Sequence, residues 1–377
     1  MSQKSIIIRG GYGYSNFGDD ALLYVLFRFL KENLPEANIL LACPAARYIE
    51  NLLGQPVTFS TTESRCDFFI LGGGTQFYWF PFDGKPRSLA KKILTEVTSP
   101  YVLFGKIQNR LLKTRPNFQH GNPNADRQIA IGIGIGPFST NEDAENQARS
   151  MLSQFEHVIV RDIKSKSYCD SWNLQQHSLG TDICYFPDFY RIEKVVNAPT
   201  PNKVAVVLRD WEHTVEGNKY CSQIELAVQQ MRRDGLNVTY VLFAETQDRH
   251  WKSWLNKRSE TPLVWQPKKE SVPSFIGSLN KFDFFVTARY HAAVFGAILN
   301  KPAICINIDE KLKQASQLLI PNLPVWNPPF RVTELLNAIK QLTSNYELHL
   351  KTLKTNTNRQ AILAQEMLHG VVQRIAE

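Results

Sequence analysis

Short, almost continuously apolar segments alternate along this chain with longer segments whose apolar residues recur with helical periodicity. Residues 5–9 form one such apolar segment, and the segment after Asp19 places Leu22, Val25 and Leu26 on one helical face. Continuously apolar strands are typical of parallel sheets that are covered on both faces. Their alternation with helices predicts βαβ units, and therefore an α/β fold built on parallel sheets.

The alternation restarts near residue 190, and residues 195–202 contain two prolines, which is typical of a linker. A chain of 377 residues also has room for two domains of the usual ~150 residues. We expect two Rossmann-like domains, 1–192 and 203–345, that face a cleft, followed by a helix over 346–377 that packs back on the first domain. The predicted strands occupy residues 5–9, 38–42, 67–71, 128–136 and 157–162, then 203–209, 237–243, 263–265, 282–287 and 302–307.

The chain is basic, with a formal net charge of +8 and an isoelectric point near 9.1. Such a charge favours acidic partners, for example phosphorylated substrates or anionic lipid, and it also fits an ordinary solvated surface. The basic amphipathic segment 104–115, within the stretch 100–120, either contacts an anionic membrane or forms a solvated helix face. No basic-aromatic motif of a known nucleic-acid module is present, so we expect no nucleic-acid partner.

The six cysteines form neither a C-x-x-C pair nor a run with the spacing of a zinc site. We therefore expect no metal site, and we expect the cysteines to be small hydrophobes in a reducing compartment. The apolar run near the N-terminus is too short for a signal peptide or a membrane span. Together these features predict a cytoplasmic protein, with peripheral contact to the inner membrane surface if the basic segment binds lipid.

Arg289 and His291 follow the predicted strand 282–287, at the turn where a helix begins. Ligands of open α/β sheets bind at the carboxyl ends of strands, beside helix N-termini. An arginine there can hold an anion and a histidine can move a proton, although a histidine can also be purely structural. Arg161 ends another strand and either pairs locally with Asp162 or supplies a second cation to the same anion.

The run Gly72-Gly73-Gly74 follows a buried strand and predicts a turn whose bare backbone N–H groups contact a ligand; a tight turn without a ligand is the alternative. The loop after the first strand does not fit a dinucleotide-binding motif, because Asn16 stands where the third glycine belongs. This loop is either a tight turn or a cradle for an anion or a sugar. Asp19 and Asp20 then either accept hydrogen bonds from sugar hydroxyls or cap the helix.

Taken together, these motifs resemble those of the polysaccharide pyruvyl transferases, in order over about 300 residues. The resemblance implies a two-domain fold like that of GT-B glycosyltransferases, with Arg289, His291 and Arg161 in the donor site. The chain departs from the family pattern at Tyr290, at Ile308 and at residues 75–77. The matching motifs are Asn16-Phe17-Gly18-Asp19-Asp20-Ala21, Gly72-Gly73-Gly74, Arg161-Asp162-x-x-Ser165, Gly180-Thr181-Asp182, Arg289-x-His291 and Asp309-x-Lys311.

The resemblance implies transfer of pyruvate from phosphoenolpyruvate to a sugar of a cell-surface glycan or exopolysaccharide, as a cyclic ketal, with release of phosphate. We therefore expect His291 to be the general acid/base and Arg289 and Arg161 to clamp the donor, with help from the glycine N–H groups. Phosphoenolpyruvate is a co-substrate, no cofactor is expected, and the acceptor is a glycan or a lipid-linked saccharide. Two alternatives stay open: a nucleotide-sugar glycosyltransferase of the same fold, and a non-catalytic relative that binds glycan or membrane.

Overall fold

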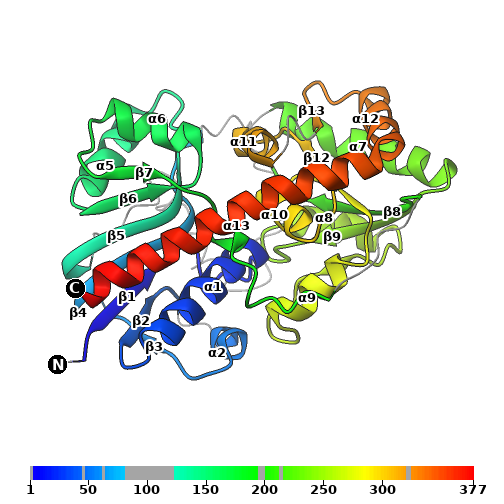
Figure 1. The fold of residues 1–377 in the computed structure, drawn as a ribbon. Coiled ribbons are helices and arrows are strands. Elements are labelled where there is room, and N and C mark those ends of the chain that lie inside the picture. Colours follow the sequence, from blue (N-terminus) through cyan, green and yellow to red (C-terminus); the bar gives the residue numbers. More distant parts are fainter. Residues whose placement is uncertain are drawn as a thin grey trace, which may run out of the picture.

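The computed structural model describes residues 3–44, 47–61, 64–80, 123–193, 200–211, 215–319 and 324–377, with the backbone alone at 215–219 and 319. The basic stretch 100–120 lies outside these residues. Two all-parallel sheets lie side by side in Figure 1, one in each half of the chain, so the predicted α/β class with two Rossmann-like sheets is confirmed.

The N-terminal sheet has seven strands in the order β3-β2-β1-β4-β5-β6-β7. Strand order reverses between β1 and β4, which is where doubly wound sheets bind ligands. The strands are β1 (Ser5–Arg9), β2 (Asn38–Ala42), β3 (Thr58–Phe59), β4 (Arg65–Phe77), β5 (Asn124–Ile135), β6 (His157–Val160) and β7 (His177–Leu179). The helical segments are α1 (Phe17–Asn33), α2 (Tyr48–Leu53), α5 (Glu142–Leu152), α6 (Ile163–Ser171) and the short 3-10 helix η1 (Ile183–Tyr185).

The C-terminal sheet has six strands in the order β10-β9-β8-β11-β12-β13, so its reversal point lies between β8 and β11. The strands are β8 (Lys203–Leu208), β9 (Asn237–Leu242), β10 (Leu263–Val264), β11 (Phe284–Thr287), β12 (Ala303–Ile306) and β13 (Val325–Trp326). The helices are α7 (Val215–Arg233), α8 (Arg249–Asn256), α9 (Val272–Leu279), α10 (Tyr290–Ile298), α11 (Glu310–Leu319) and α12 (Val332–Ser344).

The apolar strands are buried on both faces, as their composition requires. In β1, Ile7 joins the core formed with α5 and α6, whereas Ile6 and Ile8 join the core on the opposite face, which includes α1. That second core is continuous with the core of the C-terminal half. The two halves are therefore joined by shared apolar packing.

Phe17 makes much of this connection, because α1 begins inside the C-terminal half. Its backbone N–H donates to the carbonyl of Phe243 at 2.8 Å, across the two halves. Its ring is surrounded by four aromatic rings of that half, with centroids at 4.6–5.1 Å, namely Phe243, Trp265, Phe275 and Phe295. The start of α1 is thus fixed relative to both sheets.

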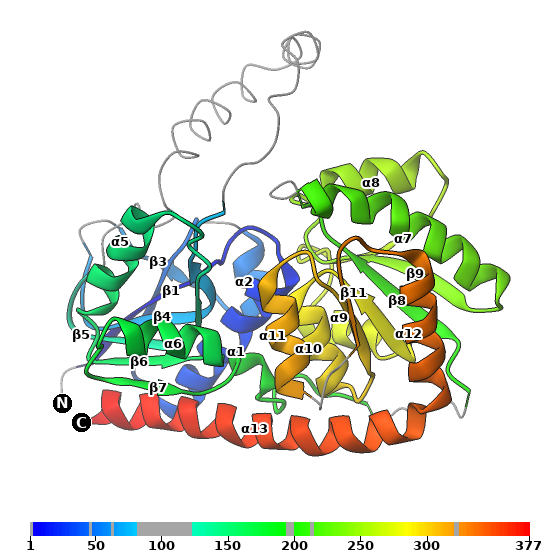
Figure 2. The same ribbon diagram turned by 90° about the horizontal axis from the view of Figure 1, so that it is seen from above.

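The final helix, α13 (Tyr346–Ala376), runs along one side of both halves, as Figure 2 shows. At its start, the Tyr346 hydroxyl donates to the carbonyl of Asp283 at 2.7 Å. Midway, Thr181 donates to Gln360 at 2.6 Å, and near the end Arg127 donates to the carbonyl of Arg374 at 2.6 Å. The helix therefore ties the C-terminal half to the N-terminal sheet.

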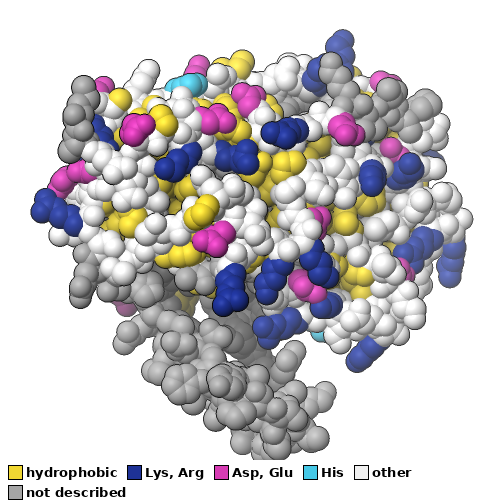
Figure 3. All heavy atoms as spheres, turned by 90° about the horizontal axis from the view of Figure 1, so that it is seen from below, with side chains coloured by type: hydrophobic (Ala, Val, Ile, Leu, Met, Phe, Trp, Pro, Cys, Tyr) yellow, Lys and Arg dark blue, Asp and Glu magenta, His cyan; other side chains and the backbone are white. Residues whose placement is uncertain are grey.

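The surface drawn in Figure 3 carries Lys and Arg side chains spread among Asp and Glu, without one continuous basic patch. On that face, the positive charge of the chain fits a solvated surface. Among the helices within the described ranges, none is long and apolar enough to cross a membrane.

Candidate functional site

Five basic side chains meet where the carboxyl ends of the two sheets face each other. Arg161 follows β6 in the N-terminal half; Arg209 follows β8, and Arg289 and His291 follow β11. Lys311 lies in the first turn of α11, after β12. Burial, together with the charges of Arg209 and Arg161, outweighs the effect of Asp309 and lowers the pKa of Lys311 to about 8, so these groups act on one another at close range. We call these five residues the cation cluster.

Arg161 is 2% exposed and is held from three sides. Its Nη1 donates to Oδ2 of Asp182 at 3.1 Å and its Nη2 to Oγ1 of Thr75 at 2.8 Å. Its guanidinium lies 4.1 Å from the ring centre of Tyr290 in the other half. Burial alone would lower the pKa of Arg161, but Tyr290 and Asp182 outweigh that effect and raise it. Arg161 is therefore a permanent cation in the site.

The predicted local pair of Arg161 with Asp162 is present but long, at 3.7 Å between Nε and Oδ2. Asp162 mainly caps α6, since its Oδ1 accepts the N–H of Ser165 at 2.7 Å. Among the residues that the structure describes, Nε of Arg161 has no hydrogen-bond partner. A buried donor of this kind is costly to leave unpaired, which favours a ligand there.

Arg289 is buried at the N-cap of α10 and is oriented by a carboxylate. Its Nη2 lies 2.5 and 2.6 Å from the two oxygens of Asp248, while its Nε has no hydrogen-bond partner within the described ranges. Its backbone N–H donates to Oγ1 of Thr287 at 2.9 Å, which fixes the turn after β11. Asp248 thus holds the guanidinium in place through Nη2 and leaves the buried Nε donor for a ligand.

His291 lies in the first turn of α10, with a side chain that is 13% exposed. Its Nε2 is 3.5 Å from Oδ2 of Asp182, an ion-pair distance that is too long for a good hydrogen bond. Burial raises the pKa of Asp182, but His291 and Arg161 outweigh burial and lower it to about 2. Ionised Asp182, from the N-terminal half, therefore faces the imidazole ring supplied by the C-terminal half.

Asp309 holds the remaining two cations together. Its Oδ2 lies 3.1 Å from Nη1 of Arg209 and 3.1 Å from Nζ of Lys311. A small cavity between the halves is lined by Lys311 and Arg161, together with Thr75, Gly134, Ile135, Gly136, Pro137, Asp162, Lys164, Glu310 and Gln314. The Asp309-x-Lys311 motif therefore delivers a lysine to the cation cluster.

The predicted glycine turn is wrong, because residues 72–74 continue strand β4 and pair with β5. A Cβ at Gly72 would stand 2.3 Å from Leu26, and one at Gly73 would stand 2.7 Å from Leu22. The glycines are thus needed for close packing of α1 on the strand. Gly74, with φ +75°, points its Cβ position toward Asp19, 3.5 Å from Oδ1. Contact of these glycines with a donor substrate stays a prediction. Gly74, which lies near Asp19, fits it better than Gly72 and Gly73, which pack against α1.

The segment Asn16–Asp20 is mostly accounted for by contacts inside the protein. The side chain of Asn16 caps α1 by accepting the N–H of Gly18 at 3.2 Å. Both oxygens of Asp20 are occupied, by the Trp265 indole N–H at 2.8 Å and by the Tyr48 hydroxyl at 2.8 Å. The expectation that Asp20 binds sugar hydroxyls is therefore wrong. Its carboxylate instead connects the two halves. Burial raises the pKa of Asp20 to about 7.

Three potential metal ligands, Asp182, Cys184 and His291, lie within 4.8 Å of one another. Asp182 already binds the Arg161 guanidinium through Oδ2, so a metal ion there would meet a fixed positive charge. Burial raises the pKa of Cys184 well above its ordinary value, so its thiol stays neutral. This set of residues fits an anion next to Arg161 better than it fits a metal ion.

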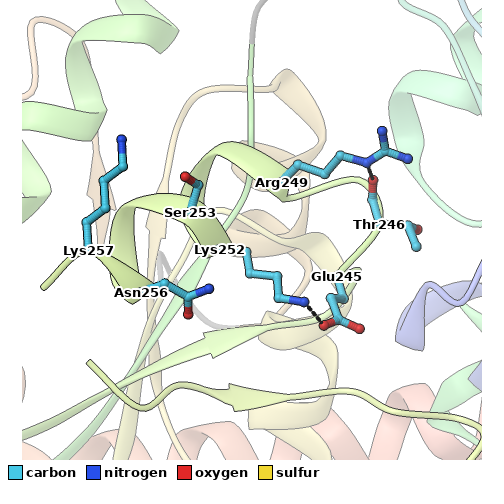
Figure 4. A pocket seen from close by; sticks show the side chains of 7 residues that line it. All are labelled: Glu245, Thr246, Arg249, Lys252, Ser253, Asn256 and Lys257. Carbon is cyan, nitrogen blue, oxygen red and sulfur yellow. Dashed lines mark hydrogen bonds and ion pairs between the residues drawn. The ribbon is translucent and has the colours of Figure 1, made fainter. Parts of the chain in front are cut away.

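A larger pocket opens on the outer face of α8 (Figure 4) and contains no member of the cation cluster. Within it, Lys252 pairs with Glu245, and Nε of Arg249 donates to the carbonyl of Thr246 at 2.8 Å. The other lining residues are Ser253, Asn256 and Lys257. Of its three cations, Lys252 and Arg249 already have partners within the protein. This pocket is therefore an ordinary polar surface and a poorer candidate than the cavity between the halves.

Sequence reasoning missed two residues of the site, Asp248 and Arg209, and it gave Asp182 only as part of the motif Gly180-Thr181-Asp182, without a role of its own. Asp182 and Asp248 are the carboxylates that orient His291 and Arg289, and Arg209 is a further cation of the cluster. Arg209 carried a usable signal, because it directly follows β8, the strand beside the reversal point of its sheet. Asp248 carried none, because its partner Arg289 is 41 residues away in the sequence.

Comparisons with known proteins agree with this architecture. A putative UDP-N-acetylglucosamine 2-epimerase from Listeria monocytogenes matches with a TM-score of 0.61 at 8% identity, over 100% of this chain and 97% of the other. The S. aureus MnaA–UDP co-structure gives 0.60 at 10% identity, over 99% and 97%. Anabaena Alr3699/HepE in complex with UDP and glucose gives 0.54 at 13% identity, over 99% and 98%. At such low identity these likenesses concern the fold, and they confirm the expected GT-B-like arrangement.

A comparison with curated protein sequences finds no match. The family model of the polysaccharide pyruvyl transferases, in contrast, matches residues 16–310. This range begins with the segment that caps α1 and ends within the first turn of α11, so it includes the cation cluster except for Lys311, one residue beyond it. Because the match covers most of the chain, the chain belongs to the polysaccharide pyruvyl transferase family.

Proposed function

We propose that this protein transfers pyruvate from phosphoenolpyruvate to two hydroxyls of one sugar, as a cyclic ketal, and releases phosphate. The observation that carries the proposal is the cation cluster, which gathers Arg161, Arg289, His291 and Lys311 from both halves around one cleft. Phosphoenolpyruvate carries a carboxylate and a phosphate, and arginines bind such groups through paired N–H donors. The buried Nε donors of Arg161 and Arg289 are available for this purpose.

In this proposal His291 protonates the methylene carbon of the donor, which leaves a cationic carbon at C2. One sugar hydroxyl attacks C2 and forms the first C–O bond, and the bond between C2 and the phosphate oxygen then breaks. The second hydroxyl attacks C2 and closes the ketal. The two protons lost by the hydroxyls are balanced by the proton added to the methylene carbon and the proton carried by hydrogen phosphate. Asp182, 3.5 Å from His291, stabilises the imidazolium that begins this sequence.

The cations also lower the barrier for phosphate departure, since they stabilise charge that builds up on the leaving oxygen. Arg161, Arg289 and Lys311 would do so in a site that excludes most water. The acceptor we propose is a glycan or a lipid-linked saccharide, and the net charge of +8 supports an anionic carrier. A cytoplasmic site of action, with peripheral contact to a membrane, goes with this proposal.

The second candidate is a nucleotide-sugar glycosyltransferase. It is favoured by the fold neighbours that were solved with UDP, and by the position of Arg209 and Arg289 at the reversal point of the C-terminal sheet. A diphosphate would suit these two arginines as well as a carboxylate and a phosphate would. Ligand binding separates the two candidates.

The first test is calorimetric titration of the purified protein with phosphoenolpyruvate, in parallel with UDP-glucose. Saturable binding of phosphoenolpyruvate alone supports the proposal, and binding of UDP-glucose alone refutes it. Phosphate release is then measured with p-nitrophenyl β-galactoside and methyl N-acetyl-β-mannosaminide as acceptors. His291→Ala should abolish turnover while the thermal unfolding transition persists; retained turnover would exclude the role of His291.

A further inference from the structure

The segment Phe17–Asp20 holds four residues in a row at the junction of the two halves, and the structure accounts for three. Phe17 fills the aromatic pocket, Gly18 makes room for the ring of His291, and Asp20 accepts hydrogen bonds from Trp265 and Tyr48. Asp19 is the residue without such an explanation. Asp19 lies between Gly18, which makes room for His291, and Asp20, which bridges the two halves. Its side chain faces the cation cluster.

The side chain of Asp19 lies against bare backbone and is only half-buried. The Cβ position at Gly11 is 3.1 Å from its Cγ, and that at Gly74 is 3.5 Å from its Oδ1. Within the part of the chain that the structure describes, its carboxylate forms no hydrogen bond and no ion pair within 4.0 Å. The charged and titratable groups that face it are His291, Arg289, Lys311 and Arg161 from three other elements, Asp20 from α1, and Tyr12 from the loop before α1.

A carboxylate in this place works against donor binding, because phosphoenolpyruvate is itself an anion that the same cations must hold. Interaction with the dipole of α1 does not explain the carboxylate at this position either, because an acidic side chain on the exposed face of the first turn would interact with the dipole equally well. The carboxylate belongs to the N-terminal half and His291 to the C-terminal half, and the two are neighbours across the junction, because a Cβ on Gly18, the residue before Asp19, would stand 2.0 Å from Nδ1 of His291. This is the arrangement that an acid and a base require.

We propose that Asp19 is the general base that removes the proton from the sugar hydroxyl attacking C2. This inference rests on the proposed pyruvyl transfer and adds the second proton-transfer group to it. The hydroxyl oxygen forms a bond to C2 while its proton moves to the carboxylate of Asp19, and His291 supplies the proton that goes to the methylene carbon. The proton on Asp19 then leaves with the phosphate, and the second hydroxyl returns a proton to His291 as it closes the ketal. Burial raises the pKa of Asp19, against the cations that lower it, which makes the carboxylate a stronger base than an exposed one.

The test compares Asp19→Asn, which keeps the size of the side chain, with Asp143→Asn as the matched control. Asp143 is an exposed acid in the first turn of α5, so its removal changes a helix-terminal charge without touching the cleft. For Asp19→Asn we expect kcat to fall by ~10²-fold or more, and KM and Kd for phosphoenolpyruvate to stay the same or fall. We expect kcat of the wild type to decline on the acid side as Asp19 is protonated, and this decline should be lost from the residual activity of Asp19→Asn.

A structural role for Asp19 would give a different pattern: weaker donor binding and a lower unfolding temperature together with the loss of kcat. That pattern, or a kcat within twofold of the wild type, would refute the role of Asp19 and leave the proposed function standing. If the wild type itself releases no phosphate from phosphoenolpyruvate with the galactoside or the mannosaminide, the proposed function fails, and the inference on Asp19 fails with it. A loss of kcat in Asp143→Asn as large as that in Asp19→Asn would also refute the role of Asp19.

Discussion

Gly18 provides a direct test of how the two halves meet in solution. It lies in α1 of the N-terminal half, where a Cβ would stand 2.0 Å from Nδ1 and 2.6 Å from Cγ of His291. Non-bonded heavy atoms keep a separation of roughly 3.5 Å. In Gly18→Ala, therefore, the imidazole has to move by roughly 1.5 Å, or the halves have to separate.

Two opposing effects set the expected stability of Gly18→Ala. Overpacking costs ~1–3 kcal/mol, whereas alanine within a helix is ~0.5–1 kcal/mol more favourable than glycine. In the wild-type background the substitution should thus be neutral or destabilising by up to ~2.5 kcal/mol. In the His291→Ala background the obstacle is gone, so the same substitution should stabilise the protein by ~0.5–1 kcal/mol.

The assay is urea unfolding of the four proteins of this double-mutant cycle, with kcat measured for the two that retain His291. The cycle should give a coupling energy of ~1–3 kcal/mol, and the misplaced ring should lower kcat by roughly 10²-fold. An equal effect of Gly18→Ala in both backgrounds would show that the ring of His291 does not lie against Gly18, and would refute the closed arrangement of the two halves.

Three further predictions follow from buried groups. The pKa of Asp20 is raised to about 7 from an ordinary value of 3.8, so the stability that its neutral form provides is complete below pH ~4 and is lost by about 4 kcal/mol as the pH rises to about 7. Urea unfolding from pH 4.5 to 8 should show this loss, and in Asp20→Asn the free energy of unfolding should change less with pH. Parallel curves of unfolding free energy against pH for the two proteins would contradict the prediction. Lys311, with a pKa near 8, loses its charge as the pH rises, so calorimetry should show weaker phosphoenolpyruvate binding above pH 8 in the wild type but a constant affinity in Lys311→Met. Phe17→Ala should lower the free energy of unfolding by ~3–5 kcal/mol, since it empties a pocket lined by four aromatic rings; a change below ~1 kcal/mol would show that this pocket is not filled in solution.

Local sequence pattern was sufficient to predict the central strands of both sheets and one part of the site, whereas the short strands β3, β7 and β13 were not predicted. The apolar runs that form β1, β8 and β11 are buried on both faces, and such runs have few alternatives to a covered strand. The same pattern placed Arg289 and His291 after β11, at the start of α10, because a strand end followed by a helix is itself a local feature. The positions of these side chains, at a strand end and beside a helix N-terminus, could therefore be predicted from their neighbours in the chain.

The tertiary structure alone decided which groups are joined and which remain available. The glycines at 72–74 are typical of a turn, yet they lie in β4, because the leucines of α1 pack on them and leave no room for side chains. Asp19 and Asp20 are adjacent and identical in type, but a contact with Trp265, 245 residues away, engages Asp20 and leaves Asp19 facing the cations. Hydrophobic periodicity predicts the structure of one segment at a time. The packing of the glycines and the different surroundings of Asp19 and Asp20 depend instead on contacts between distant segments, which only folding brings together.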